Sequence, residues 1–211
     1  MDDHPHEAAT NTMTDDTRHR TPRKGLSQGK ICAAALALID EEGLPALNMR
    51  RLGAVMGVEA MSLYRHVPNK QAILEGVVDL VLVGLADDAP GDVRDQVFRF
   101  FASLHDVLAA HPNAIPLVAN SALQTGSARD QVERLLAAMR ESGVDEQRVL
   151  DAFHSLESFT LGYAWLEVGG FVGELPETAP FVRSNVPRGA SARHDRYDRC
   201  LRAVLEALLS P

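Results

Sequence analysis

The sequence has few of the features that define membrane or secreted proteins. No apolar run approaches the roughly 18 residues of a membrane-spanning helix, and the acidic, polar N-terminus has no apolar centre of a signal peptide. Only two cysteines occur among the 211 residues, Cys32 and Cys200, and both lie within apolar helical patterns. This number and placement exclude a disulfide framework. We therefore expect a cytoplasmic protein with reduced, buried thiols and no membrane partner.

Signatures of catalysis and of metal binding are also lacking. The chain has no HExxH or CxxC motif, and His105, His111 and His154 do not have the spacing of metal ligands. GLSQG (25–29) matches the GxSxG pattern, but no strand pattern precedes it, as the nucleophile turn of that motif requires. The segment GLSQGKI (25–31) differs from a phosphate-binding loop, because its glycines are one residue too close and no hydroxyl residue follows Lys30. The sequence predicts no enzyme, no metal site and no obligatory cofactor.

Charge is distributed unevenly along the chain, whose formal net charge is −8. Between Arg18 and Lys70 there are nine basic and four acidic residues, whereas from Gln71 onward there are twelve basic and twenty acidic residues. A basic N-terminal part attached to an acidic body permits contact with DNA at one end. The same basic excess is compatible with ordinary solvation, so charge alone leaves both interpretations open.

Apolar residues recur with a helical period throughout, and the sequence has neither an alternating strand pattern nor an internal repeat. Caps and glycines predict three short N-terminal helices, the third over about 59–67, and a fourth from Asn69. Longer helices are expected from Val93 to the segment HPNAIP, around 132–139, and over 145–168 and 193–209. The Gly- and Pro-rich segment 169–191 is expected to form a loop.

These patterns predict an all-α fold made of four parts. They are a disordered tail over 1–22, a three-helix unit of helix-turn-helix length over 23–70, a connecting helix over 71–88 and a helical body over 89–211. The segment ADDAPGD marks the expected boundary between the connecting helix and the body.

The third predicted helix carries side chains suited to contact with DNA. A helical wheel forms its outward surface from Met61, Ser62, Tyr64 and Arg65, and places His66 nearer the packed side. Such guanidinium, hydroxyl and phenol groups contact base edges and phosphates in a major groove. Lys70 and the start of the next helix can bind phosphate as well. The alternative is a generic helical corner, in which Met61 and His66 serve packing.

The same region resembles a known family. The segment ICAAALALIDEEGLPALNMRRLGAVMGVEAMSLYRHVPNKQAIL resembles the N-terminal DNA-binding domain of the tetracycline-repressor (TetR) family. Its most diagnostic part is Gly57-Val58, followed after a gap by Leu63-Tyr64-Arg65-His66-Val67 and by Asn69-Lys70. Farther on, ESGVDEQRVLDAFHSLESFTLGYAWLE is similar to the ligand-binding domain of the tetracycline-repressor branch.

The resemblance implies that 23–70 is a DNA-binding domain and that 89–211 binds a ligand and forms dimers. Residues expected near base edges are Arg50, Ala60, Met61 and Ser62, and those expected at phosphates are Tyr64, Arg65, His66 and Lys70. Alanine at position 60 removes a polar side chain that some family members use to contact bases. A tetracycline-type operator is therefore not expected.

The resemblance also assigns 145–168 and 193–209 to a four-helix dimer interface, and their apolar faces agree with this. The expected effector is a small organic inducer. Candidate pocket residues are Phe101, His105, Met139, Phe153, His154, Glu157, Tyr163 and Trp165, although core or interface packing would also explain each of them. Val118 stands where the family's metal-binding histidine aligns, so no obligatory metal is expected.

Two functions remain in competition at this level. The first is a sequence-specific regulator, expected to be a repressor that binds a palindromic double-stranded DNA operator as a homodimer and is released by an inducer. The second is an architectural or interaction protein whose basic helix binds DNA through phosphates without sequence choice. Only the first should retain a large preference for one sequence at physiological salt.

Overall fold

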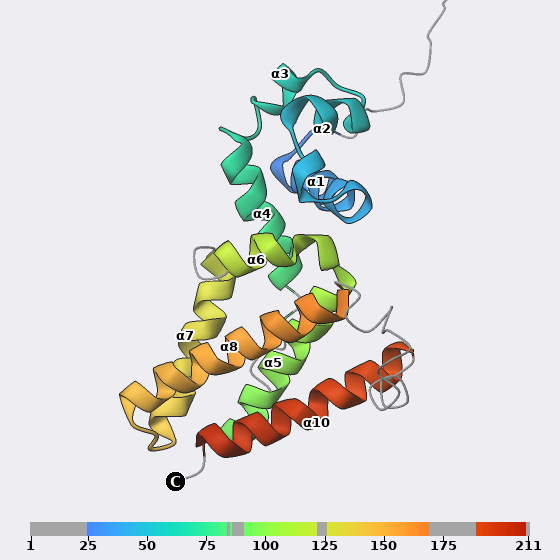
Figure 1. The fold of residues 1–211 in the computed structure, drawn as a ribbon. Helices are drawn as coiled ribbons and strands as arrows, with labels where there is room; N and C mark the ends of the chain where they lie inside the picture. Colours follow the sequence, from blue (N-terminus) through green and yellow to red (C-terminus); the bar gives the residue numbers. More distant parts are fainter. Residues whose placement is uncertain (1–24, 84, 86–90, 122–125, 169–188, 210–211) are drawn as a thin grey trace, which may run out of the picture.

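The computed structural model describes residues 25–83, 85, 91–121, 126–168 and 189–209, and every regular element within them is a helix (Figure 1). The elements are α1 (Gln28–Glu42), η1 (Leu44–Ala46), α2 (Met49–Met56), α3 (Ala60–Leu63), α4 (Lys70–Leu82), α5 (Val93–Ala110), η2 (Pro112–Ala114), α6 (Ile115–Ser121), α7 (Gly126–Glu141), α8 (Glu146–Val168) and α10 (Ala190–Leu209). The predicted all-α fold is confirmed. Among the described residues, no helix is long and apolar enough to cross a membrane.

Three predictions about the helices differ from the structure. The third helix is not continuous to Val67: α3 ends at Leu63, and the backbone N–H groups of His66 and Val67 donate to the Leu63 carbonyl in a tight turn. The short helix α6 was not expected, because the segment HPNAIP indicated a break, yet its one proline, Pro116, lies in its first turn, where no donor is needed. The last helix begins at Ala190 instead of Arg193.

Some predictions concern residues outside the described part of the chain. These are the tail over 1–22, most of the break at ADDAPGD, and the loop over 169–191 as far as residue 188.

Local capping signals fix the helix-turn-helix. The side chain of Asn48 accepts a hydrogen bond from the Arg51 N–H at 2.9 Å, and Asn69 does the same for Ala72 at 2.9 Å. Gly57 ends α2 in the left-handed region, with φ of 67°, and the Val58 N–H donates to the Gly53 carbonyl at 2.9 Å. Residues 57–59 therefore form a short turn that orients α3 relative to α2.

One hydrophobic core joins the N-terminal helices to the body. Ile31, Leu38 and Ile39 of α1 are fully or almost fully buried and pack in the same cluster as Ile73 and Val77 of α4. The α4 helix also contacts α5, α6 and α7, so it belongs to both halves of the molecule. In Figure 1, α1 lies alongside α4, α2 and α3 lie toward one end of α4, and the body lies at the other end.

The body is built around α5, α8 and α10, which contact one another pairwise (Figure 1). Phe101 of α5 and Phe153 of α8 pack with ring centroids 5.7 Å apart. The guanidinium of Arg202 on α10 lies 3.8 Å from the ring centroid of Phe98 on α5. A second link joins the body to α1, because His111 Nδ1 lies 2.9 Å from an Asp40 carboxylate oxygen and Asn113 donates to the Asp40 carbonyl at 2.9 Å.

Substitution of Gly53 tests the packing of the turn. A Cβ at this position would lie 2.8 Å from the Val58 carbonyl oxygen, which is backbone and cannot move aside without displacing α3. Gly53→Ala should lower the free energy of unfolding by roughly 1–3 kcal/mol, measured by urea denaturation at fixed protein concentration. Gly29→Ala is the matched control, because its Cβ would meet open space within α1. A Gly53→Ala protein as stable as the control would contradict the described turn.

Candidate nucleic-acid interface and ligand cavity

The helix-turn-helix exposes both polar and apolar side chains at one end of the molecule. Leu63 and Val67 are buried in the core, at 0% and 1% exposure, and they anchor α3 and the turn that follows it. Met61 on the opposite side is 72% exposed, and Tyr64 is 44% exposed. The interpretation of Met61 as a packing residue is therefore wrong. An exposed methionine beside a phenol gives this surface an apolar tip among polar groups.

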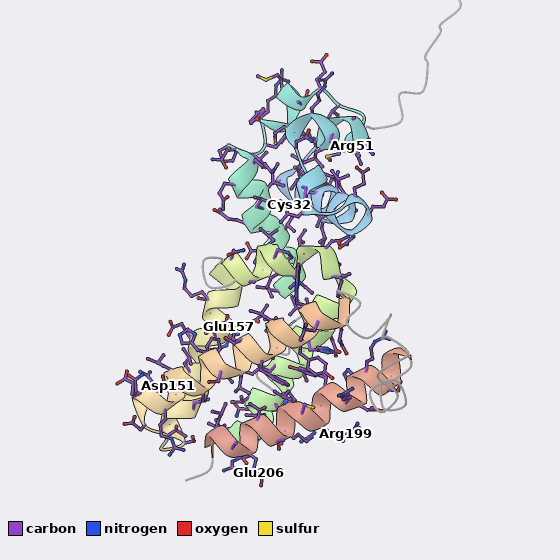
Figure 2. All side chains as sticks on the ribbon, in the orientation of Figure 1. Cys32, Arg51, Asp151, Glu157, Arg199 and Glu206 are labelled. Atoms are coloured by element: carbon purple, nitrogen blue, oxygen red, sulfur yellow. The ribbon has the colours of Figure 1, made fainter. Side chains whose placement is uncertain are left out.

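The basic residues of this surface differ in whether they have a partner. Arg51 of α2 forms an ion pair with Glu42 of α1, with Nε 3.2 Å from each carboxylate oxygen, and the hydrogen bond from Arg51 lowers the pKa of Glu42 (Figure 2 labels Arg51). Arg50, Arg65 and Lys70 are exposed and have no hydrogen-bond or ion-pair partner in the described part of the chain. These three cations are available for an anionic partner.

The remaining predicted DNA-contacting residues occupy the same region. Ala60 and Ser62 are partly exposed on α3, and the Ser62 N–H donates to the Glu59 carbonyl at 2.8 Å. His66 is exposed and does not lie on the packed side. The helical wheel placed His66 wrongly, because the wheel assumes a helical rotation of about 100° per residue. The residues after Leu63 form a turn, so this rotation does not apply to them.

Some of the eight predicted pocket residues pack against one another, but they do not line one described cavity together. Phe101, Met139 and Phe153 are core residues, each less than 5% exposed. Trp165 is 52% exposed on α8, and His154 is also exposed, with its Nδ1 3.6 Å from a carboxylate oxygen of Glu157. That pair lies at the surface and does not line an interior pocket. The remaining two, His105 and Tyr163, belong to a buried polar cluster.

This cluster crosses the interior between α5, α8 and α10. Tyr197 is 0% exposed, and its hydroxyl lies 2.8 Å from Thr160 Oγ1 and donates to the Phe101 carbonyl at 3.0 Å. Burial raises the pKa of Tyr197, so the phenol stays protonated and remains a donor. Thr160 Oγ1 lies 2.8 Å from both the Tyr197 oxygen and the Leu156 carbonyl oxygen, and with Tyr197 donating to Phe101 the single proton of Thr160 can be donated to the Tyr197 oxygen. The three helices are thereby fixed in register by hydrogen bonds as well as by apolar packing.

His105 connects this cluster to a cavity. Its ring stacks on Tyr197 with centroids 3.8 Å apart and 9° between planes, and its Nε2 lies 2.9 Å from a Glu167 carboxylate oxygen. The ring of Tyr163 meets the His105 ring edge-on, with centroids 5.8 Å apart. Burial raises the pKa of Tyr163. Of the predicted pocket residues, only His105 lines the cavity, which has a volume of about 300 Å³ and is bordered by His105, Asp106, Ala109, Glu167, Ser191, Arg193 and His194.

Sequence reasoning missed Thr160, Glu167, His194 and Tyr197. Thr160 and Glu167 lie within the segment that resembles the family's ligand-binding domain, and Tyr197 falls on the apolar face of the last helix. Their helical period was visible in the sequence. Their pairing with α5 was not, because it depends on how helices that are distant in sequence pack together.

Two family models match the chain. The model described as "Bacterial regulatory proteins, tetR family" matches residues 31–77, which run from α1 into α4. The model described as "Tetracyclin repressor-like, C-terminal domain" matches residues 85–207, which include α5 through most of α10.

Curated relatives agree with these matches. An HTH-type transcriptional regulator of Saccharopolyspora erythraea is 33% identical over 139 residues, which are 65% of this chain and 59% of the relative. The HTH-type transcriptional repressor DrrR1 of Streptomyces coeruleorubidus is 30% identical over 150 residues, which are 69% of this chain and 55% of that protein. The chain thus spans less than two thirds of the length of these relatives.

Solved structures share the fold. The Streptomyces coelicolor TetR family protein ActR, in complex with (S)-DNPA, has a TM-score of 0.68 at 26% identity, covering 87% of this chain and 97% of that chain. BioQ with its double-stranded DNA operator has a TM-score of 0.61 at 26% identity, covering 85% and 99%. The two family models together extend over most of the helices described above, and this chain belongs to the TetR family of bacterial transcriptional regulators.

Proposed function

We propose that this chain is a sequence-specific repressor that binds a palindromic operator as a homodimer and leaves the operator when a small organic effector binds. The observation that carries the proposal is the exposed face of the helix-turn-helix. It combines the cations of Arg50, Arg65 and Lys70 with the exposed side chains of Met61 and Tyr64. Cations and neutral contact groups on one rigid face are what a protein needs to hold phosphates and to contact bases together.

Within this face, the residues divide by position. Arg50 at the start of α2, together with Ala60, Met61 and Ser62 of α3, is assigned to base edges. The phosphate group comprises Tyr64, Arg65, His66 and Lys70, which follow α3 or begin α4. Lys70 lies at the N-terminus of α4, where backbone N–H groups add to the attraction for phosphate. The solved complex of BioQ with its operator supports DNA as the partner.

A homodimer is supported by the apolar side chains that α8 exposes. Leu150, Trp165, Leu166 and Val168 are 42%, 52%, 53% and 47% exposed. Large apolar side chains repeated along one helix favour coverage by another surface. We call the exposed face of the helix-turn-helix, with Arg50, Met61, Tyr64, Arg65 and Lys70, the reading surface. A two-fold dimer through α8 and α10 would place two reading surfaces about 34–36 Å apart, which is one turn of DNA.

Control by an effector is supported by the path from the body to the reading surface. The α4 helix carries the helix-turn-helix at one end and packs on α5, α6 and α7 at the other, and Asp40 of α1 is held by His111 and Asn113. A ligand that prefers one arrangement of the body helices would therefore shift the separation of the two reading surfaces. The solved complex of ActR with (S)-DNPA supports an organic ligand for this fold. The proposed function requires no catalytic chemistry.

Variants of Arg50, Ser62 and Lys70 test the division of roles. Binding is measured on a DNA site enriched from a random pool. Arg50→Ala and Ser62→Ala should both relax the preference for that sequence. Loss of a bidentate arginine contact in Arg50→Ala should reduce the discrimination between bases by about 1–3 kcal/mol. Lys70→Ala should weaken specific and unrelated DNA alike and should reduce the slope of log affinity against log salt by about 1. Fluorescence anisotropy over a salt series measures both quantities. Altered sequence choice in Lys70→Ala, with none in Arg50→Ala, would reverse the assigned roles.

Substitution of Trp165 tests the dimer. Trp165→Glu should place a charge in a desolvated interface and convert the protein to a monomer, with loss of binding to the palindrome. Sedimentation velocity gives the oligomeric state. Leu80→Glu is the matched control, because Leu80 is also exposed, at 37%, but lies on α4. A Trp165→Glu protein that remains dimeric at the same concentration would contradict the α8 interface.

A further inference from the structure

Three side chains that bind transition metals converge beside the cavity between α5 and α10. His194 Nδ1 lies 3.0 Å from Asp106 Oδ1, and His105 Nδ1 lies 3.9 Å from the same oxygen. One ligand atom from each of the three residues lies within 4.8 Å of the other two. Two imidazoles and a carboxylate are a common ligand set for divalent ions of the later first-row transition metals.

The hydrogen bonding of His105 leaves a lone pair directed at this group. Its Nε2 lies 2.9 Å from the Glu167 carboxylate, which as an ionised acid only accepts hydrogen bonds, so Nε2 carries the proton. In the neutral ring, Nδ1 is then an acceptor. This atom is buried and has no hydrogen-bond partner among the described residues, in a side chain that is 4% exposed. Asp106 cannot supply a proton when ionised, and a cation can satisfy the lone pair and the carboxylate together.

The surroundings of His105 hold its ring in this orientation. The ring stacks on Tyr197, whose hydroxyl is fixed by Thr160 and by the Phe101 carbonyl. A histidine whose second nitrogen donates to a carboxylate is the usual arrangement around a protein-bound metal. Glu167 therefore acts as a positioning residue for His105. A preoriented ligand loses little conformational freedom when a metal binds.

His194 lies between two carboxylates. Its Nδ1 lies 3.0 Å from Asp106 Oδ1, and its Nε2 lies 3.6 Å from Asp198 Oδ2, which is beyond hydrogen-bond distance. The other carboxylate oxygen of Asp198 is buried and unpaired within the described part of the chain. The cavity is also bordered by the carboxylates of Asp106 and Glu167 and by the guanidinium of Arg193. The two carboxylates outnumber the one guanidinium at the cavity wall, which favours a cation.

We propose that His105 Nδ1, Asp106 and His194 Nδ1 bind one divalent transition-metal ion of the Zn²⁺ type and join α5 to α10. Zinc–ligand distances of about 2.0–2.2 Å require the ligand atoms to approach one another. Asp106 and His194 can supply that movement, because their side chains are 59% and 42% exposed. Three protein ligands leave a position open toward the cavity for water or another small ligand. This site is independent of the proposed DNA binding.

The full chain is first treated with a chelator to remove bound metal. Titration of this chain with Zn²⁺ then tests the proposal. The background variant is His4→Ala/His6→Ala, because the N-terminal segment DDHPHE offers two other histidines. We expect about one Zn²⁺ per chain by calorimetry, with the same affinity in the background variant and in the unaltered chain. Co²⁺ should show the d–d absorption of a nitrogen- and oxygen-ligated ion. Absence of saturable binding, or its loss in the background variant, would overturn the proposal.

Variants of the exposed ligands assign the site. His194→Ala and Asp106→Ala, made in the background variant, should each weaken Zn²⁺ binding by tenfold or more and abolish the rise in Tm on Zn²⁺ addition. His154→Ala is the matched control, because His154 is exposed and lies near a carboxylate but lies outside the cluster. Its affinity should be unchanged. Undiminished Zn²⁺ affinity in His194→Ala, or an equal loss in His154→Ala, would refute the assigned ligands.

Discussion

The packing of α4 on α1 is the interaction on which the rest of the structure depends. Ile73, Val77 and Val78 of α4 are completely buried, and they belong to a core that continues from α1 into the body. Because α4 also contacts α5, α6 and α7, its position fixes the orientation of the reading surface relative to the body. A close-packed interior responds to changes by discrete rearrangement and not by gradual deformation. A change in the body can therefore be transmitted to the reading surface.

The reading surface shows why total charge is a poor guide to partners. The chain carries a net charge of −8, yet Arg50, Arg65 and Lys70 of the helix-turn-helix are exposed and have no partner among the described residues. Arg51, which is adjacent in sequence, is instead occupied by Glu42. At physiological salt, screening confines electrostatic attraction to about 8 Å. Under the proposed function, DNA at this face would respond mainly to nearby cations and little to the acidic body.

The sequence predicted features that depend on neighbouring residues better than those that depend on distant ones. The caps at Asn48 and Asn69 and the left-handed Gly57 were recognisable, because each acts within four residues along the chain. The end of α3 was misplaced, because the residues after Leu63 form a turn in which the N–H groups of His66 and Val67 both donate to the Leu63 carbonyl. The DNA-contacting roles stay a prediction. The pairing of His105 with Glu167 and His194 joins residues far apart in sequence, so no ligand spacing could reveal it.

Selection of bound sequences from a random pool of double-stranded DNA, at about 0.15 M salt, tests the central claim most directly, because this salt suppresses binding through phosphates alone. The account predicts enrichment of a palindrome whose half-sites are about one helical turn apart. Enrichment should be retained when the salt concentration is raised moderately, since base contacts are less sensitive to salt than phosphate contacts. A pool that remains random, while the protein still binds DNA at low salt, would contradict a sequence-specific dimer. It would favour the architectural alternative.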